Sequence, residues 1–478
     1  YALFIACAAA IGGFLFGFDT SVINGTLDAL RFKLGANDAQ LGLAASIAVL
    51  GAACGAFFAG ALADKFGRRR VMITSSVLFL ISAIGSGNPY FFTTAGTAAN
   101  MIEFIVWRVI GGVGVGAASI IVPAYIAEIS PAPLRGRLAT MQQFAIVIGI
   151  FAALLSNYFL GEIAGGGAVV MDEVTRLASD VTKIGGFETW QWMFWIECIP
   201  AILYGLLVLF IPESPRYLVA RKQPEKAGEI LSKILSPSIV AQKIEDIKKS
   251  LHSEIAPKFS DLLEKVAGKT RLAPIVWVGI GVAALQQFVG INVIFYYGNV
   301  LWESVGFTQQ DAMKTSVLSS VVNIASTVIA IALVDRLGRK PLLLAGSIGM
   351  FVTLGIMAAI FGTAGLDTNG NPEISGAVAY IAVISANFYV VFFAFSWGPV
   401  CWVLLGEMFN NRIRGAALAL GGLSQWISNF AISSSFPILL AKIGLGGAYG
   451  IYSFFAFVSI FFVLKKVQET KGKELEDM

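Results

Sequence analysis

The feature that most constrains this chain is a series of long apolar stretches that continues over its whole length. A helix that crosses a bilayer needs about 20 mostly apolar residues, and twelve stretches meet that requirement. They cover residues 1–25, 41–62, 71–88, 100–125, 138–161, 190–211, 272–301, 313–334, 341–363, 375–405, 416–440 and 446–464. Because 56% of the residues are hydrophobic and only 13% are charged, the composition excludes an ordinary soluble domain and predicts an integral membrane protein.

Basic residues gather in alternate connections between these stretches, and this pattern predicts the topology. The basic clusters are Lys65 to Arg70, Arg135 to Arg137, Arg216 to Lys222, Arg336 to Lys340, Arg412 to Arg414 and Lys465 to Lys473. Basic connections face the cytoplasm, so both termini are predicted to be cytoplasmic in a multi-pass protein of a plasma or inner membrane. Because no exposed basic domain is present, nucleic acid is not expected as a partner.

A hydrophilic segment divides the apolar stretches six and six. We predict an N-terminal six-helix half over 1–212, a cytoplasmic linker over 213–270, a C-terminal six-helix half over 271–467 and a cytoplasmic tail over 468–478. Within the linker, apolar residues share one helical face at 227, 230, 231 and 234, and another at 240, 244, 247 and 251. We expect these amphipathic helices to pack against the cytoplasmic ends of the spans.

An internal repeat supports the same division. The sequence Asp64-Lys65-Phe66-Gly67-Arg68-Arg69 recurs as Asp335-Arg336-Leu337-Gly338-Arg339-Lys340, each between the second and third spans of its half. Glu128 precedes Arg135 by seven residues, and Glu407 precedes Arg414 by the same interval. Two similar six-helix halves around a central site are the architecture of transporters that work by alternating access.

Further motifs accompany this repeat in the order and on the spans that a known family shows. They are Arg108-Val109-Ile110-Gly111-Gly112, Pro212-Glu213-Ser214-Pro215-Arg216, Gln286-Gln287-Phe288-Val289-Gly290-Ile291-Asn292 and Glu469-Thr470-Lys471-Gly472. With them the chain resembles the sugar porter family of the major facilitator superfamily, and most closely the bacterial and algal sugar/proton symporters such as the bacterial xylose/proton symporter. The resemblance implies an all-α membrane protein with twelve transmembrane helices in two pseudo-symmetric six-helix halves.

Polar side chains inside the spans suit a sugar, which is a ring of hydroxyls with one apolar face. Side-chain amides both donate and accept hydrogen bonds, and an aromatic ring can cover the apolar face. The resemblance maps the sugar contacts onto Gln143, Gln286, Gln287, Asn292, Asn323, Trp402 and Gln425, with Asn429 and Trp426 as further candidates. The alternative is that these amides only bond neighbouring helices, as amides in membranes often do.

The N-terminal half carries charges inside its spans instead. An ionised Asp at mid-membrane costs about 2.5–3.5 kcal/mol, and Asp19, Arg108 and Glu197 all lie within apolar stretches. In the symporters that the chain resembles, the acid matching Asp19 binds the proton and the arginine matching Arg108 is its partner. Our hypothesis is that Asp19 binds the proton, Arg108 sets its affinity and Glu197 belongs to their network. The alternatives are a static ion pair, or an Asp19 that lies near a helix end, in headgroups or water.

The charges of the cytoplasmic connections form a second group. We predict that salt bridges among them hold the inside closed and break when the transporter opens inward. The residues are Asp64, Arg68, Glu128, Arg135 and Glu213 in the N-terminal half, and Asp335, Arg339, Glu407 and Arg414 in the C-terminal half. The alternative reading as topology signals explains the arginines but not the acids at matched spacing.

These features together predict a secondary active transporter that couples proton entry to uptake of a neutral monosaccharide, with a hexose such as glucose favoured over a pentose such as xylose. A facilitative sugar uniporter is the nearest alternative, and a non-transporting sugar receptor is a second. The sequence has no P-loop and no convincing metal or nucleophile pattern, so an ATP-driven pump or an enzyme is not expected. We expect a monomer without cofactors, whose partners are the sugar, the proton and the lipid bilayer.

Overall fold

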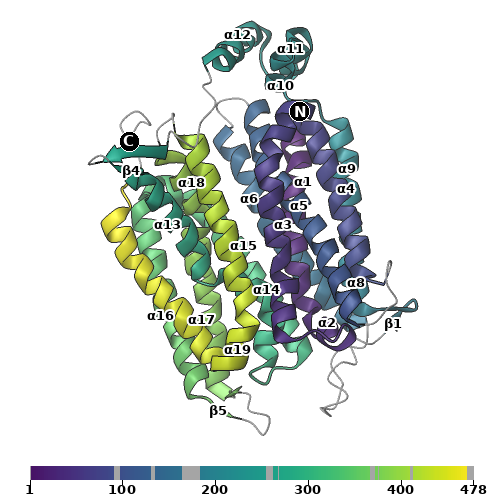
Figure 1. The fold of residues 1–478 in the computed structure, drawn as a ribbon, viewed down its shortest axis with the longest axis vertical. Helices are drawn as coiled ribbons and strands as arrows, with labels where there is room; N and C mark the ends of the chain where they lie inside the picture. Colours follow the sequence, from purple (N-terminus) through teal and green to yellow (C-terminus); the bar gives the residue numbers. More distant parts are fainter. Residues whose placement is uncertain are drawn as a thin grey trace. The chain divides into compact units, whose positions relative to one another are not determined.

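The fold is almost entirely helical (Figure 1). A computed structural model describes residues 2–90, 97–130, 135–163, 183–253, 262–266, 269–366, 372–374, 376–409 and 413–470, and the side chains at some positions within these ranges fall outside the description. The helices up to the linker are α1 (Ala2–Ser21), η1 (Val22–Gly25), α2 (Leu27–Lys33), α3 (Asp38–Phe66), α4 (Arg68–Gly87), α5 (Thr97–Ile129), α6 (Arg135–Ile163), α8 (Thr189–Trp195) and α9 (Cys198–Phe210).

The rest of the chain repeats this helical pattern after a cytoplasmic segment. That segment holds α10 (Pro215–Ala220), α11 (Pro224–Ser232) and α12 (Pro237–Ser253). The helices that follow are α13 (Pro274–Phe288), α14 (Ile291–Glu303), α15 (Gln309–Leu337), α16 (Arg339–Thr363), α17 (Gly376–Ala394), α18 (Trp397–Glu407) and α19 (Arg414–Lys466). Three two-stranded antiparallel hairpins pair β1 (Lys183–Ile184) with β2 (Phe187–Glu188), β3 (Leu263–Val266) with β4 (Lys269–Leu272), and β5 (Gly365–Leu366) with β6 (Pro372–Glu373).

Within the described residues, eleven helices are long and apolar enough to cross a membrane. The predicted spans 416–440 and 446–464 both lie inside α19, which turns at Gly444 with φ 69° and ψ 177°. Glycine adopts such a positive φ without steric cost, so two spans follow one another with no loop between them. This accounts for the difference from the twelve predicted spans, and the all-α membrane fold is confirmed.

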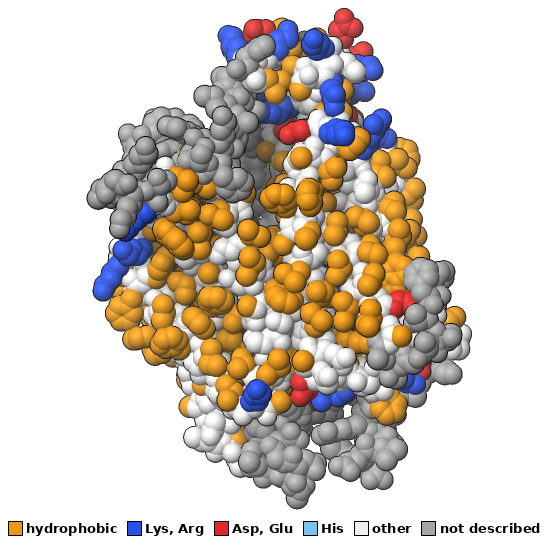
Figure 2. All heavy atoms as spheres, viewed as in Figure 1, with side chains coloured by type: hydrophobic (Ala, Val, Ile, Leu, Met, Phe, Trp, Pro, Cys, Tyr) orange, Lys and Arg blue, Asp and Glu red, His pale blue; other side chains and the backbone are white. Residues whose placement is uncertain are grey.

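Apolar side chains are spread over the helices on the face that Figure 2 shows. Large ones are strongly exposed, including Phe57 at 70%, Phe210 at 75% and Tyr380 at 73%. Soluble proteins rarely expose continuous apolar surface of this extent, whereas a helix in the hydrocarbon core of a bilayer requires it. These faces are therefore lipid-facing surface.

Two compact units form within the chain. The first comprises residues 1–20, 50–153 and 191–256, and the second comprises 21–49, 154–190 and 257–478. The division passes through α1, α3, α6 and α8 and does not follow the boundaries 212 and 271. The division into two six-helix halves therefore stays a prediction.

The apolar faces of the cytoplasmic helices pack on one another. Ala227 and Leu231 of α11 and Ile247 of α12 form a small core with Leu218 and Val219 of α10. The predicted stripes exist, but their partners are these neighbouring helices, because α10 supplies an apolar face of its own. The predicted stripe ends at residue 251, and the strands β3 and β4 that follow it were not predicted.

Glycines hold α1 against α6 in the first unit. A Cβ on Gly17 would collide with Ile146 O, and a Cβ on Gly149 would collide with Phe14 O. Small residues let helix backbones approach closely in membranes. This reciprocal contact fixes the helix that carries Asp19.

We expect Gly149→Val to destabilise the fold, because a backbone carbonyl cannot move aside as a flexible side chain can. Overpacking costs about 1–3 kcal/mol, so the midpoint of thermal unfolding in detergent falls and the yield of folded protein drops. Gly60→Val is the matched control, since a Cβ there meets nothing within 4 Å. Equal losses for both variants would contradict the close contact of α1 with α6.

Candidate proton and sugar sites

The buried ion pair of the first unit joins the last turn of α1 to the middle of α5. Arg108 Nη1 donates to Asp19 Oδ1 at 2.7 Å, and Arg108 Nη2 donates to the main-chain oxygen of Asp19 at 2.8 Å. Asp19 is 0% exposed and Arg108 1% exposed. The carboxylate is thus enclosed by protein, which excludes the alternative that it lies among lipid headgroups.

Local packing orients the guanidinium toward α1. The Arg108 guanidinium carbon lies 5.7 Å from the centre of the Phe194 ring of α8, and an aromatic face attracts a cation at this distance. Arg108 is therefore held by the carboxylate and the main-chain carbonyl of Asp19 and by the ring of Phe194, and both residues are far from it in the sequence.

Glu197 is the third charged group of this region and lies at the break between α8 and α9. Its side chain is 0% exposed, and neither carboxylate oxygen has a hydrogen-bond partner among the described residues. The charges that act on it most strongly are those of Asp19 and Arg108. Over the same described ranges, Asp19 Oδ2 and Arg108 Nε also lack hydrogen-bond partners. Buried polar groups are normally paired, so the hydrogen bonding of this cluster is incomplete within the described part of the chain.

The predicted amides of the second unit form a connected chain where α13 ends and α14 begins. Gln286 Nε2 donates to Trp397 O at 2.8 Å, Gln287 Nε2 to Gln286 Oε1 at 3.3 Å, and Asn292 Nδ2 to Gln287 Oε1 at 2.6 Å. Adjacent residues on a regular helix point about 100° apart. The helix is interrupted at Gly290, with φ 85°, and Asn292 of the new helix reaches back to Gln287.

The other predicted sugar residues lie on α6, α15, α18 and α19. Asn323 of α15 and Asn429 of α19 are buried, and Asn429 Oδ1 accepts from Ser433 Oγ at 3.0 Å. Gln425 and Trp426 of α19 are partly buried, and Trp402 of α18 is 42% exposed. Gln143 of α6 is partly buried in the first unit.

A charge cluster at the cytoplasmic end of the first unit joins α4 to α5. Arg68 donates to Glu128 through Nε at 3.1 Å and Nη2 at 3.0 Å, and its Nη1 lies 3.0 Å from Asp64 Oδ1. Glu213 Oε1 accepts from the main-chain N–H of Arg68 at 2.9 Å, where α4 begins. An acid at this place satisfies free N–H groups and complements the helix dipole.

The second unit repeats this arrangement with its own residues. Arg339 donates to Glu407 through Nε at 3.0 Å and Nη2 at 2.7 Å. Glu469 accepts from the main-chain N–H groups of Arg339 and Lys340, each at 3.0 Å, and so takes the part of Glu213. Sequence reasoning missed this role of Glu469, although an acid followed by a hydroxyl residue occurs at 213–214 and again at 469–470. The side chains of the predicted gate residues Arg135, Asp335 and Arg414 lie outside the described part of the chain.

A buried polar junction in the second unit was not predicted. Asn24 Oδ1 of η1 accepts from the main-chain N–H of Asn299 at 2.8 Å, and Ser316 Oγ of α15 donates to Asn299 Oδ1 at 2.9 Å. These bonds join η1 to two consecutive helices, α14 and α15, that lie far from it in the sequence. Because Asn24 and Asn299 belong to no recognisable motif, only the fold reveals their meeting.

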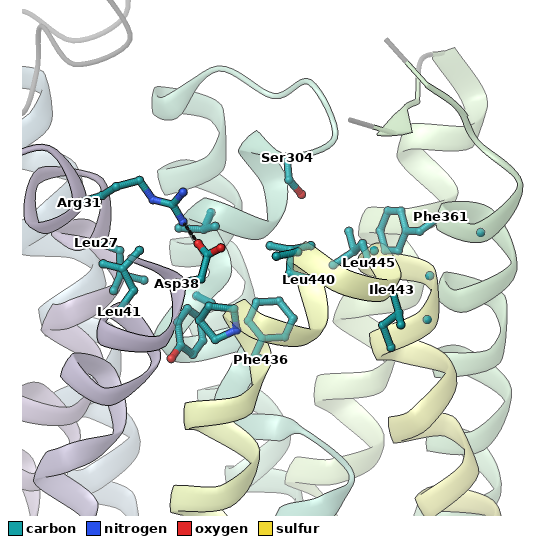
Figure 3. A pocket seen from close by; sticks show the side chains of 18 of the residues that line it. Leu27, Arg31, Asp38, Leu41, Ser304, Phe361, Phe436, Leu440, Ile443 and Leu445 are labelled. Carbon is teal, nitrogen blue, oxygen red and sulfur yellow. Dashed lines mark hydrogen bonds and ion pairs between the residues drawn. The ribbon is translucent and has the colours of Figure 1, made fainter. Parts of the chain in front are cut away.

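The second unit also contains a cavity of about 550 Å³ (Figure 3). Arg31 and Asp38 line it and form an ion pair at 2.6 Å, and Phe361 and Phe436 line it as well. Tyr297 also lines it and donates to Ser433 O at 2.7 Å, at a kink in α14. None of the nine predicted sugar residues belongs to this lining, so the cavity is separate from the amide chain.

Comparison with known proteins gives matches over the whole chain. The family model described as sugar (and other) transporter matches residues 5–478. The glucose transport protein of Synechocystis is 53% identical over 478 residues, covering all of this chain and 97% of that protein. The D-xylose-proton symporter of Escherichia coli is 35% identical over 503 residues, covering all of this chain and 95% of that protein. Among solved structures, the partially occluded inward-open conformation of the xylose transporter XylE from E. coli matches with a TM-score of 0.82 at 34% identity, over 99% of each chain.

Proposed function

This chain belongs to the sugar (and other) transporter family, and from that premise we propose that it is a secondary active transporter that couples proton entry to uptake of a neutral monosaccharide. A member of this family is a multi-pass membrane transporter and not an enzyme. The observation that carries the proposal is the buried Asp19–Arg108 pair, because a facilitative carrier of a neutral sugar has no need of a titratable acid at that place.

The favoured substrate is glucose. The relative that is 53% identical is named a glucose transport protein, whereas the D-xylose-proton symporter is 35% identical. A hexose differs from a pentose by one hydroxymethyl group, and a site built to bond a given hydroxyl discriminates against a sugar that lacks it. Xylose remains the second candidate substrate.

Proton coupling follows from the chemistry of the ion pair. Protonation of Asp19 removes the charge that attracts Arg108 Nη1 and frees the arginine to face Glu197, whose carboxylate has no hydrogen bond within the described part of the chain. The sugar-loaded carrier can then change conformation with its buried charges balanced. Moving one charge through about 100 mV yields roughly 2.3 kcal/mol, which sustains a sugar gradient on the order of fifty-fold.

For sugar binding we propose the chain Gln286, Gln287 and Asn292. Its amides are bonded mainly to one another, so sugar hydroxyls can replace these bonds without leaving an amide unpaired. The remaining proposed contacts are Gln143, Asn323, Trp402, Gln425, Trp426 and Asn429. The protein acts as a monomer in the lipid bilayer.

The test is counterflow in proteoliposomes with a panel of hexoses and pentoses, with and without a pH gradient. We expect glucose to exchange, to accumulate only with an inward proton gradient, and to alkalinise the outer medium when added. Counterflow without alkalinisation identifies a uniporter. Sugar binding without counterflow identifies a receptor.

We further propose that the Arg68–Glu128 and Arg339–Glu407 pairs close the cytoplasmic side in one state of the cycle. Each pair lies partly exposed, with a side-chain exposure of 12% for Arg68 and 14% for Glu128, and of 10% for Arg339 and 31% for Glu407. Solvent therefore screens them, and exposed pairs contribute at most about 1 kcal/mol. A pair of this strength shifts the balance between states without fixing one of them.

We expect Glu128→Gln to change the rate of sugar exchange about two- to fivefold, because a loss of this size alters the population of the closed state. The initial rate of counterflow at equal protein content measures it. Asp311→Asn is the matched control, since Asp311 forms an ion pair with Lys314 on the protein surface. If Glu128→Gln exchanges sugar at the same rate as the control, these charges act only as topology signals.

A further inference from the structure

Ser82 of α4 lies beside the proton site, and neither the motifs nor the proposed mechanism uses it. The residue is 0% exposed, and its hydroxyl has no hydrogen-bond partner among the residues that the structure describes. Two other hydroxyls of the same helix are satisfied locally: Thr74 donates to Arg70 O and Ser75 to Val71 O, both at 3.0 Å. Such bonds one turn back are the usual solution for serine and threonine within helices. Ser82 and Ser86 depart from it, and of these two only Ser82 lies against Gly111.

Gly111 of α5 shows where the free hydroxyl lies. A Cβ on Gly111 would collide with Ser82 Oγ and would lie 3.4 Å from Asp19 Oδ1. Both oxygens therefore line the same face of this glycine. The absent side chain leaves the serine hydroxyl and the aspartate carboxylate adjacent, with no group of α5 between them.

We propose that Ser82 is a positioning residue that accepts a hydrogen bond from the protonated carboxyl group of Asp19. In the ion-paired state Asp19 Oδ1 is held by Arg108 and Ser82 is unused. Once protonated, Asp19 gains a donor and loses its attraction to Arg108. Ser82 Oγ is then an acceptor without another partner, on the same face of Gly111 as Asp19 Oδ1. While Asp19 is protonated the proton stays on its carboxyl group, and Ser82 stabilises this protonated state by accepting the hydrogen bond.

The other groups around α1 do not offer this partner. Arg108 has donors only, and in the proposed mechanism the Glu197 carboxylate becomes the partner of Arg108 once Asp19 is protonated. Tyr204 of α9 lies against Gly12, about two turns away along α1, and α6 faces Gly17 with the backbone of Ile146. A neutral hydroxyl next to the carboxylate is therefore the group suited to hold its protonated form.

This inference rests on the proposed proton coupling, and the experiment separates the two. Sugar exchange is measured in proteoliposomes with the same pH on both sides, over a series of pH values. For Ser82→Ala we expect the pH of half-maximal exchange to move down by about half a unit to one unit, because only the protonated state loses a hydrogen bond. The sugar KM at acid pH stays unchanged.

Two variants control this result. Ser82→Thr keeps the hydroxyl and is expected to keep the wild-type midpoint, and Ser75→Ala removes a buried hydroxyl of the same helix that already bonds Val71 O. An unchanged midpoint in Ser82→Ala, or a shift to higher pH, overturns the inference while proton coupling stands. A threonine variant that folds but shifts like the alanine variant also overturns it. Wild-type exchange that is equal at every pH, with no accumulation in a proton gradient, overturns the proposed coupling as well.

Discussion

Asp19→Asn is expected to abolish proton-driven accumulation of sugar while counterflow continues. Asparagine keeps the shape of the side chain and still accepts from Arg108 Nη1, but it cannot take up a proton. The sugar concentration inside vesicles with an inward proton gradient should then only equal that outside, against the roughly fifty-fold excess that one proton per sugar allows at about 100 mV. The measurement is uptake of labelled sugar at steady state, with alkalinisation of the medium recorded in parallel.

The matched control for this prediction is Asp28→Asn. Asp28 lies nine residues further along the chain in α2, is partly exposed, and lines the cavity of Figure 3. Its neutralisation should leave accumulation intact. Wild-type accumulation in the Asp19→Asn variant would show that Asp19 and Arg108 form a static ion pair.

Gln287→Ala is expected to raise the KM for sugar about tenfold to a hundredfold. Gln287 stands in the middle of the amide chain, so its removal leaves Asn292 Nδ2 without an acceptor and takes one donor from Gln286 Oε1. Leaving a buried polar group unpaired costs about 1–3 kcal/mol, and the sugar loses an amide partner as well. The KM of counterflow measures the loss, and kcat is expected to change less.

Asn387→Ala provides the comparison for that loss. Asn387 Nδ2 donates to Val383 O of its own helix, α17, so this amide is partly buried in the same unit but bonds only locally. Its loss should leave the KM unchanged. If Gln287→Ala folds and shows the same KM as this control, the amides serve only to join helices.

Much of the fold could be predicted because membrane helices are specified locally. Apolar stretches of about 20 residues fix where helices lie, and Gly290 marks the interruption that lets Asn292 reach Gln287. The α19 turn is different: Gly444 is one of 51 glycines, and nothing nearby in the sequence distinguishes a turn inside a helix from a loop between two helices. The β3–β4 hairpin was missed because the linker was interpreted by its helical stripes alone.

The candidate sites were predictable where a costly or repeated residue marks them. Asp19, Arg108 and Glu197 stand out because charge is expensive in a membrane, and Arg68 and Glu128 because their spacing recurs. Ser82 carries no charge and occurs among several serines of α4, so its unpaired hydroxyl becomes visible only when packing places it beside Gly111. Asn24 and Asn299 are likewise informative only as a pair, and their 275-residue separation hides that pair in the sequence.

The two hydrogen bonds from Arg108 to Asp19 differ in their acceptor, which is the carboxylate in one and the main-chain oxygen in the other. Only the bond to the carboxylate depends on the charge of Asp19, whereas the bond from Nη2 ends on a main-chain oxygen that does not titrate. We expect this second bond to keep the arginine close to α1 while Nη1 leaves the carboxylate and the guanidinium turns toward Glu197. A device of this kind works equally well in both directions, so a reversed proton gradient should drive sugar out of the cell as readily as the forward gradient draws it in.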